Sequence, residues 1–236
     1  MLRLTTLLLI GLSAQTALSP ARAPFMGTTP IPCTAGSQTV ASWSNTQSIT
    51  STDSNWDASS PSSTPPGSIS WDNTSYLATS AGTGNNNTNL NVARCVAGNS
   101  TCLGHLLAGE AFFSVPPSAT VIGVAFTFYR WQNSTVGSSV IFETNHIHLC
   151  ASGQSWPGCT DYGKTGNMSA WPGSSSAGSE TYGSSSDTWG GVTTASQVNS
   201  GLTFILQPEV DSTGHFDVGG FNAHTNGWMV TVTWTC

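Results

Sequence analysis

Charged side chains are scarce in this chain of 236 residues. Asp, Glu, Lys and Arg together make up 7% of the sequence, whereas about 25% is usual for a soluble domain. Basic residues are the scarcest, because only Arg94, Arg130 and Lys164 occur after residue 23. A protein that binds a phosphate backbone or an anionic membrane surface needs clustered Lys and Arg. The sequence therefore predicts neither nucleic acid nor such a membrane surface as a partner.

A long apolar segment is also missing. The longest run, 4–14, is too short to span a bilayer, so membrane insertion is not expected. The run follows the positive charge of Arg3 and precedes small residues, an order that predicts a secretory signal peptide over 1–21. Cleavage can follow Ala21 or Ala23, and the first is favoured because a proline would follow the second cut. The alternative is a buried N-terminal helix. The signal predicts a secreted protein, extracellular or on the cell surface.

Close CxxC pairs of the kind that hold zinc are absent. Six cysteines in an exported chain are instead expected to form disulfides, and six cysteines allow many pairings. The spacing favours one set, because two pairs bracket short turn-like segments and the other two cysteines lie near the ends of the mature chain. The predicted disulfides are Cys33–Cys236, Cys95–Cys102 and Cys150–Cys159.

Helical apolar stripes and heptads are missing as well, whereas alternation is common. Segments 120–131 and 227–236 alternate apolar and smaller or polar residues, which predicts half-buried strands. The second pattern places Cys236 on the core face. The first pattern places four residues on one face: Ile122, Val124, Phe126 and Phe128. Further strands are expected around 38–44, 74–79, 103–107, 111–115, 140–149, 202–207 and 215–221.

Many short strands separated by loops rich in Ser, Gly, Asn and Pro are typical of sandwiches. We therefore predict an all-β fold: an antiparallel β-sandwich, jelly-roll-like and stapled by disulfides. The predicted organisation is a signal peptide over 1–21, an N-terminal arm over 22–37 and one β-sandwich domain over 38–236.

Several segments carry short motifs whose order and spacing are informative together. They are SWSN (42–45), DNTSYLAT (72–79), VPPSATVIGVAFTFYR (115–130), TYGSSSDTWGG (181–191), QVNSGLTFIL (197–206) and GWMVTVTW (227–234). Together they resemble a domain found in phage virion and tail proteins and in some bacterial surface proteins, over most of 38–235. The resemblance implies a β-sandwich with a structural or adhesive role, and it brings no catalytic residues.

The segment NHIHLC places His146 and His148 two residues apart. In a strand, such residues face the same way, so both imidazoles could reach one metal ion. The ordinary alternative is an exposed pair without a function, on the face opposite Ile147 and Leu149. Candidate third ligands are His105, His215, His224, Asp217 and Glu143.

Other catalytic patterns lack support. No GxSxG elbow accompanies the many serines, so we predict that the protein is not an enzyme. Glu209 and Asp211 lie close together in what reads as a loop, and with Asp217 they are a possible calcium ligand set, although no EF-hand pattern is present. The predicted cofactor is none, with calcium or a transition metal as the alternatives.

Nine tryptophans are the stronger clue to function. Trp156 and Trp171 lie in turn-like sequence, where an aromatic ring can stack on the apolar face of a sugar or fold back to seal the sandwich. Trp189 and Tyr182 lie in TYGSSSDTWGG, and for them we favour an anchoring role, with Asp187 fixing the turn through backbone N–H groups. All five are candidate binding residues.

These features lead to three functional hypotheses. The first is an exported, non-enzymatic binding or adhesion module for carbohydrate or a cell-surface polymer. The second is a self-assembling structural subunit of an extracellular coat or filament. The third is a metal-dependent enzyme that uses His146 and His148.

Overall fold

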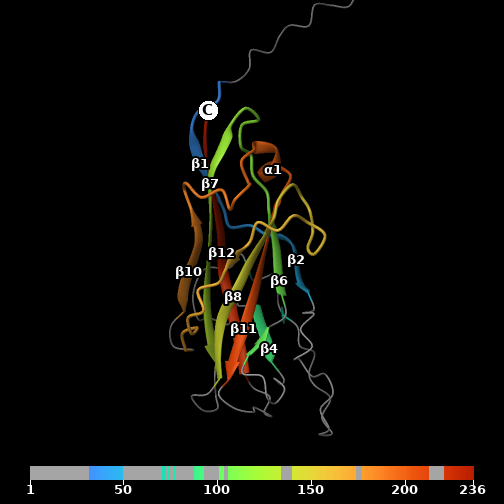
Figure 1. Cartoon of the computed structure of the whole chain (residues 1–236), viewed down its shortest axis with the longest axis vertical. Helices are drawn as coiled ribbons and strands as arrows, with labels where there is room; N and C mark the ends of the chain where they lie inside the picture. The colour runs from blue at the N-terminus through green and yellow to red at the C-terminus, as the bar shows by residue number, and fades with distance from the viewer. Residues whose placement is uncertain are drawn as a thin grey trace, which may run out of the picture. The chain divides into compact units, whose positions relative to one another are not determined.

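The computed structural model describes residues 32–49, 71–72, 74, 77, 88–92, 101–103, 106–133, 140–173, 177–212 and 221–236. The chain divides into two compact units, Met1–Pro32 and Cys33–Cys236. The predicted signal peptide and most of the predicted arm lie outside the described residues. The fold below is that of the second unit (Figure 1).

Two antiparallel six-stranded sheets form this unit and confirm the predicted all-β sandwich. Sheet A has the order β10-β7-β12-β4-β3, with β1 also paired to β12; sheet B has the order β2-β6-β11-β8-β9, with β5 also paired to β11. The strands of sheet A are β1 (Gly36–Val40), β3 (Trp71–Asp72), β4 (Thr88–Val92), β7 (Thr120–Asn133), β10 (Gly178–Ser184) and β12 (Phe221–Thr235). The strands of sheet B are β2 (Ser44–Ile49), β5 (Thr101–Leu103), β6 (Leu106–Ala111), β8 (Val140–Cys150), β9 (Lys164–Thr165) and β11 (Leu202–Ser212). One short helix, α1 (Ala195–Asn199), precedes β11 (Figure 1).

The core lies between the two sheets and is rich in aromatic rings. Phe126 of β7 stacks on Phe204 of β11 with ring centroids 4.5 Å apart. Trp228 of β12 meets Phe126 edge to face at 5.1 Å, and all three rings are fully buried. Removing one such ring from a core costs about 3–5 kcal/mol. These contacts join the central strands of one sheet to those of the other.

The prediction for the core face of β7 is wrong at one residue. Val124, Phe126 and Phe128 are fully buried, but Ile122 is 38% exposed and Val121 is buried in its stead. The pairing of β7 with β12 shifts register between Thr233 and Trp234. A bulge of this kind adds a residue to one strand and reverses the faces beyond it, which strict alternation cannot anticipate.

Two of the predicted disulfides are present in the described part of the chain. Cys33–Cys236 joins the segment before β1 to the residue after β12, and Cys150–Cys159 closes a loop after β8. Cys236 is exposed rather than on the core face, because it lies beyond the end of β12. The predicted Cys95–Cys102 bridge falls on Cys95, which lies outside the described residues.

An ion pair is buried beside the aromatic core. Arg130 of β7 pairs with Glu180 of β10, and each is 6% exposed. Thr144 and Tyr182 both donate hydroxyl hydrogen bonds to Glu180 Oε2, at 2.7 and 3.0 Å. The Arg130 guanidinium lies over the Trp171 ring, 5.9 Å from its centroid. One of the few basic side chains therefore serves the interior rather than an anionic partner.

Replacing one member of this ion pair should lower the free energy of unfolding more than replacing both. Arg130→Met leaves the Glu180 carboxylate buried without its cation, and we expect the free energy of unfolding to fall by about 3–5 kcal/mol. The double variant Arg130→Met/Glu180→Met should lose much less, because no charge stays buried. Urea denaturation of the three proteins measures both values. A double variant that is as unstable as Arg130→Met contradicts this account.

His224 provides a pH-dependent term in the stability of sheet A. Burial lowers its pKa from the ordinary 6.5 to about 4, and its ring stacks on Trp131 with centroids 5.2 Å apart. Because the unfolded chain binds this proton more readily, the free energy of unfolding falls as the pH drops from 6.5 toward 4, by up to about 3 kcal/mol. His224→Gln should lose less stability over that window in urea denaturation. An unchanged pH profile in the variant would refute the assignment.

Candidate functional site

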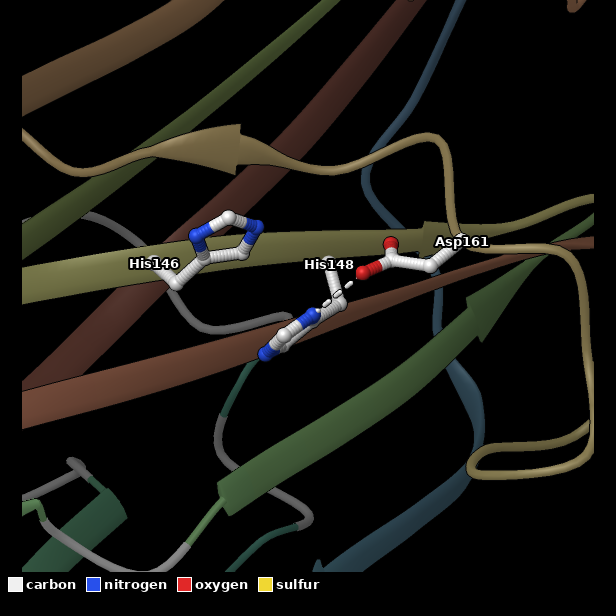
Figure 2. A group of neighbouring side chains, drawn as sticks. All are labelled: His146, His148 and Asp161. Carbon is white, nitrogen blue, oxygen red and sulfur yellow. Dashed lines mark hydrogen bonds and ion pairs between the residues drawn. The ribbon is translucent and has the colours of Figure 1, made fainter.

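The two histidines predicted to share a strand face do so. His146 and His148 on β8 point away from the core, whereas Ile147 and Leu149 are fully buried. The two imidazole rings lie side by side with centroids 4.3 Å apart (Figure 2). Both side chains are partly buried on the outer face of sheet B. Because the side chains of a strand alternate between its two faces, the sequence predicted the shared face of these two histidines correctly.

Asp161 completes a group of three with these histidines. Its Oδ2 accepts a 2.7 Å hydrogen bond from His148 Nδ1 (Figure 2). Its Oδ1 accepts backbone N–H bonds from Gly163 at 2.8 Å and Leu149 at 3.2 Å. One ligand-type atom from each of the three side chains lies within 4.8 Å of the others.

The return of the chain after the Cys150–Cys159 disulfide brings Asp161 to this place. Beyond the bridge the chain runs antiparallel to β8, and Tyr162 N donates to Leu149 O at 3.0 Å. Strand β9 then pairs with His146 and its neighbour. Asp161, two residues after Cys159, therefore lies beside His148, two residues before Cys150.

Of the five third ligands expected from the sequence, the two that the structure describes do not join this group. His105, His215 and Asp217 lie outside the described residues. His224 is on β12 in the other sheet, and Glu143 is on β8, opposite Glu209 of β11. The residue that the sequence analysis missed is Asp161, and its position could have been predicted. The predicted disulfide places residues that are equally far from its two cysteines opposite one another, as Asp161 and His148 are.

The pKa values of His146 and Asp161 both depend on their neighbours in this group. Burial lowers the pKa of His146 below its ordinary value of 6.5; the charge of His148 lowers it further, and the charge of Asp161 raises it. Burial on its own would raise the pKa of Asp161. Hydrogen bonds from His148 and from two backbone N–H groups outweigh that effect, so the pKa of this carboxyl lies below its ordinary value. Asp161 is therefore an anion at neutral pH.

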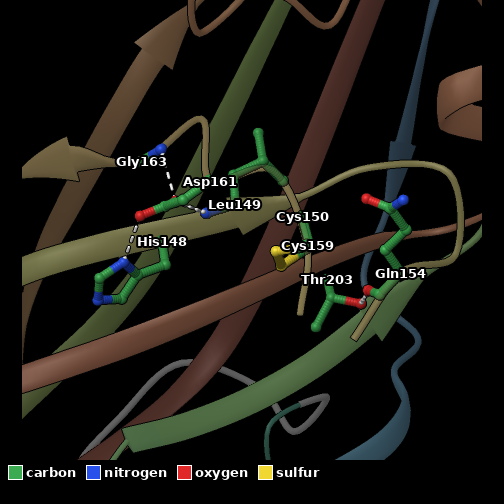
Figure 3. The surroundings of a disulfide bond; sticks show 8 residues. All are labelled: His148, Leu149, Cys150, Gln154, Cys159, Asp161, Gly163 and Thr203. Atoms are coloured by element: carbon green, nitrogen blue, oxygen red, sulfur yellow. Dashed lines mark hydrogen bonds and ion pairs between the residues drawn. A yellow bond between two sulfur atoms is a disulfide. The ribbon is translucent and has the colours of Figure 1, made fainter. Parts of the chain in front are cut away.

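A loop closed by a disulfide lies against the outer face of sheet B (Figure 3). Beneath it is a small apolar cluster, defined by Leu106, Ala108, Cys150 and Ile205, against which Trp156 packs. The loop is also hydrogen-bonded to its surroundings at several points: Ser152 N to Gln197 O at 3.0 Å, Gly153 N to Gly201 O at 3.0 Å, and Thr203 Oγ1 to Gln154 O at 3.3 Å. These bonds and the disulfide hold the loop in one position on the sheet.

Trp156 of this loop lies next to the histidines. Its ring and that of His148 have centroids 4.1 Å apart, and the Trp156 side chain is partly exposed. The side-chain oxygen of Gln207 lies 3.2 Å from His148 Nε2. An aromatic ring, two imidazoles, a carboxylate and an amide thus meet on one surface, which we call the Trp156 site.

The exposure expected for Trp171 is wrong, since the ring is 1% exposed. Its indole N–H donates to Thr144 Oγ1 at 3.1 Å, and its backbone N donates to Phe142 O at 2.7 Å. Tyr182 is buried as well; its ring is parallel to that of Phe128, and its hydroxyl accepts from Asn167 N at 2.9 Å. Neither ring offers a free face to a ligand.

Trp189 and Asp187 have the anchoring roles predicted for TYGSSSDTWGG. Trp189 is 3% exposed, and its indole N–H donates to Val124 O at 2.8 Å. Asp187 Oδ1 accepts from Trp189 N at 2.8 Å, which fixes the turn, and its Oδ2 pairs with Lys164. The Lys164 hydrogen bond lowers the pKa of Asp187 below its ordinary value. This segment is architectural.

The acidic residues considered for calcium lie in a strand rather than a loop. Glu209 and Asp211 belong to β11, and Glu209 is buried and accepts a hydrogen bond from Asn145. Asp217 lies outside the described residues. A buried, partnered carboxylate is poorly placed to join an exposed calcium site, so the loop interpretation of Glu209 is corrected.

No protein-family model matches the chain, and no curated protein matches it in sequence. The resemblance to a domain of phage and bacterial surface proteins therefore stays a prediction. Within the described ranges, no helix has both the length and the apolar character that crossing a bilayer requires. The two disulfides fit a protein that folds in an oxidising, extracellular environment.

The mutual influence within the Trp156 site predicts opposite pKa changes in two variants. Asp161→Asn removes the anion that raises the pKa of His146, so that pKa should fall further below 6.5. His148→Gln removes a neighbouring positive charge, so the same pKa should rise. NMR titration of the His146 ring proton measures both changes, with His224 as the internal control. Shifts in the same direction would show that the three groups are not coupled as described.

Proposed function

We propose that this protein is an exported, non-enzymatic binding module that recognises carbohydrate at the Trp156 site. One observation carries the proposal: of the three loop tryptophans considered as binding residues, Trp156 alone is not buried. Its ring lies beside polar side chains rather than within the core.

The chemistry of the site suits a sugar. An aromatic ring can pack against the apolar C–H face of a pyranose, while a few fixed polar groups bind the hydroxyls and set specificity. Asp161 supplies a carboxylate and Gln207 an amide close to His148, which itself stacks with Trp156. The low overall charge of the chain favours a neutral ligand over a strongly anionic one.

The site is also held in place before any ligand arrives. The Cys150–Cys159 bridge closes the loop, and backbone hydrogen bonds from Ser152 and Gly153 fix it to neighbouring segments. A fixed loop loses little conformational entropy on binding, which favours affinity at a small contact area. Export, predicted from the N-terminal segment, agrees with the disulfides.

The alternative role as a coat or filament subunit stays a prediction. It rests on the sequence resemblance and the low charge, and no contact in the described part of the chain favours it. Binding at the Trp156 site is the function with a defined location on the molecule.

Glycan binding should depend on the Trp156 ring. We expect the wild-type protein to bind at least one class of oligosaccharide on a glycan array. Trp156→Ala should weaken binding of that oligosaccharide at least about tenfold in calorimetric titration, the scale of an interface hot spot. Trp156→Phe should retain part of the affinity, because a smaller aromatic face remains.

Trp234→Phe is the matched control, since Trp234 is a partly exposed tryptophan on β12, outside this site. It should bind as the wild type does. Absence of binding to any glycan, or equal binding by Trp156→Ala, would overturn the proposal. Equal far-UV circular dichroism and melting of the variants shows that a loss of binding is not a loss of fold.

A further inference from the structure

Three side chains of the Trp156 site form a donor set that suits a metal ion, and Asp161 is the one among them that also supplies a polar group for the proposed glycan recognition. His146 and His148 come from β8, and Asp161 comes from the segment that returns beside it. Their ligand-type atoms lie within 4.8 Å of one another. Two imidazole nitrogens and one carboxylate oxygen are ligands that Zn²⁺ takes in proteins, at about 2.0–2.2 Å.

The donor atoms face one small space. A Cβ placed on Gly163 would lie 2.6 Å from His146 Nε2 and 2.8 Å from Asp161 Oδ1. Both side chains therefore lie close to the Gly163 backbone, together with the Ile147 carbonyl oxygen, and a side chain at position 163 would collide with them. On the other side, Asp161 Oδ2 lies 2.7 Å from His148 Nδ1. Small rotations of the side chains bring all three donors to bonding distance of one ion.

Neighbouring groups hold the donors in the orientation that a metal needs. Gln207 Oε1, 3.2 Å from His148 Nε2, can accept the proton of that nitrogen, which leaves Nδ1 for the ion. A partner of this kind on the second ring nitrogen is usual for histidines that bind metals. The backbone N–H groups of Gly163 and Leu149 hold Asp161 Oδ1, so that Oδ2 faces His148.

We propose that His146 Nε2, His148 Nδ1 and Asp161 bind a single Zn²⁺ ion. The ion takes the place of the proton shared by His148 Nδ1 and Asp161 Oδ2, and that proton is released to solvent. Three protein ligands leave a fourth position on Zn²⁺ for water or a ligand atom. The partial exposure of the Asp161 side chain, 30%, places that position within reach of solvent.

The competing explanation is an ion pair of His148 and Asp161 with His146 merely adjacent. The two accounts differ in what zinc does to His146, because an ion pair alone gives that ring no reason to respond to the metal.

The experiment is calorimetric titration of ZnCl₂ into the purified exported chain after chelation and dialysis. We expect one equivalent of Zn²⁺ per chain and release of a proton, seen as a dependence of the heat on the buffer. Asp161→Asn and His146→Asn should each weaken binding at least about tenfold. His224→Gln, which removes a histidine of β12 in the other sheet, should leave the affinity unchanged.

NMR of the wild-type protein provides a test that needs no variant to fold. Zinc should shift or broaden the ring signals of His146 and His148 and leave that of His224 unchanged. Binding of no zinc, unaltered binding in both Asp161→Asn and His146→Asn, or loss of binding in His224→Gln would each overturn the proposal. These readouts involve no glycan, so the zinc site and the glycan site can fail independently.

Discussion

Aromatic packing between the two sheets is the interaction on which the rest of this structure depends. The chain has few charges. Burial of apolar side chains is therefore the main contribution that offsets the conformational entropy lost when the polar chain becomes ordered. Phe126, Phe204 and Trp228 supply that burial at the centre, where the middle strands of both sheets meet. The buried Arg130–Glu180 pair fills one flank of this core and holds neighbouring strands of sheet A together.

The position of the Trp156 site follows from this packing. Because the core occupies one face of each strand, alternation directs the remaining side chains of β8 and β11 outward, among them His148 and Gln207. The outer surface would be an ordinary polar sheet face but for the disulfide-closed loop. That loop places the Trp156 ring beside His148, and the chain that follows it places the Asp161 carboxylate there as well. The two proposed ligands, a sugar and a zinc ion, would share the Asp161 carboxylate and otherwise use different groups of this site.

Much of this arrangement can be predicted from patterns among residues that are close together in the sequence. Alternation predicts β7 and β12 and the shared face of His146 and His148, and turn-like spacing predicts the Cys150–Cys159 bridge. Residues 74, 77 and 112–115, also expected in strands, are not in strands. Alternation fails at Ile122, because a bulge adds this residue to β7 without a mark in the local sequence, and at Cys236, which follows the end of β12. Burial of Trp171 depends on Arg130 and Phe142, both distant in sequence. The contact between Asp161 and His148 could have been predicted, because it requires only the Cys150–Cys159 disulfide and the antiparallel return of the chain that this disulfide implies.

The strand order has a consequence for how the protein is made. Strands β11 and β12 follow the others in sequence, yet each lies in the middle of its sheet and pairs on both sides. Strand β12 joins β7 on one side to β1 and β4 on the other, and β11 joins β8 to β5 and β6. Neither sheet can therefore close around a partial chain during synthesis. Assembly of the whole sandwich waits until β12 has been made, so these strands cannot complete their pairing early in synthesis.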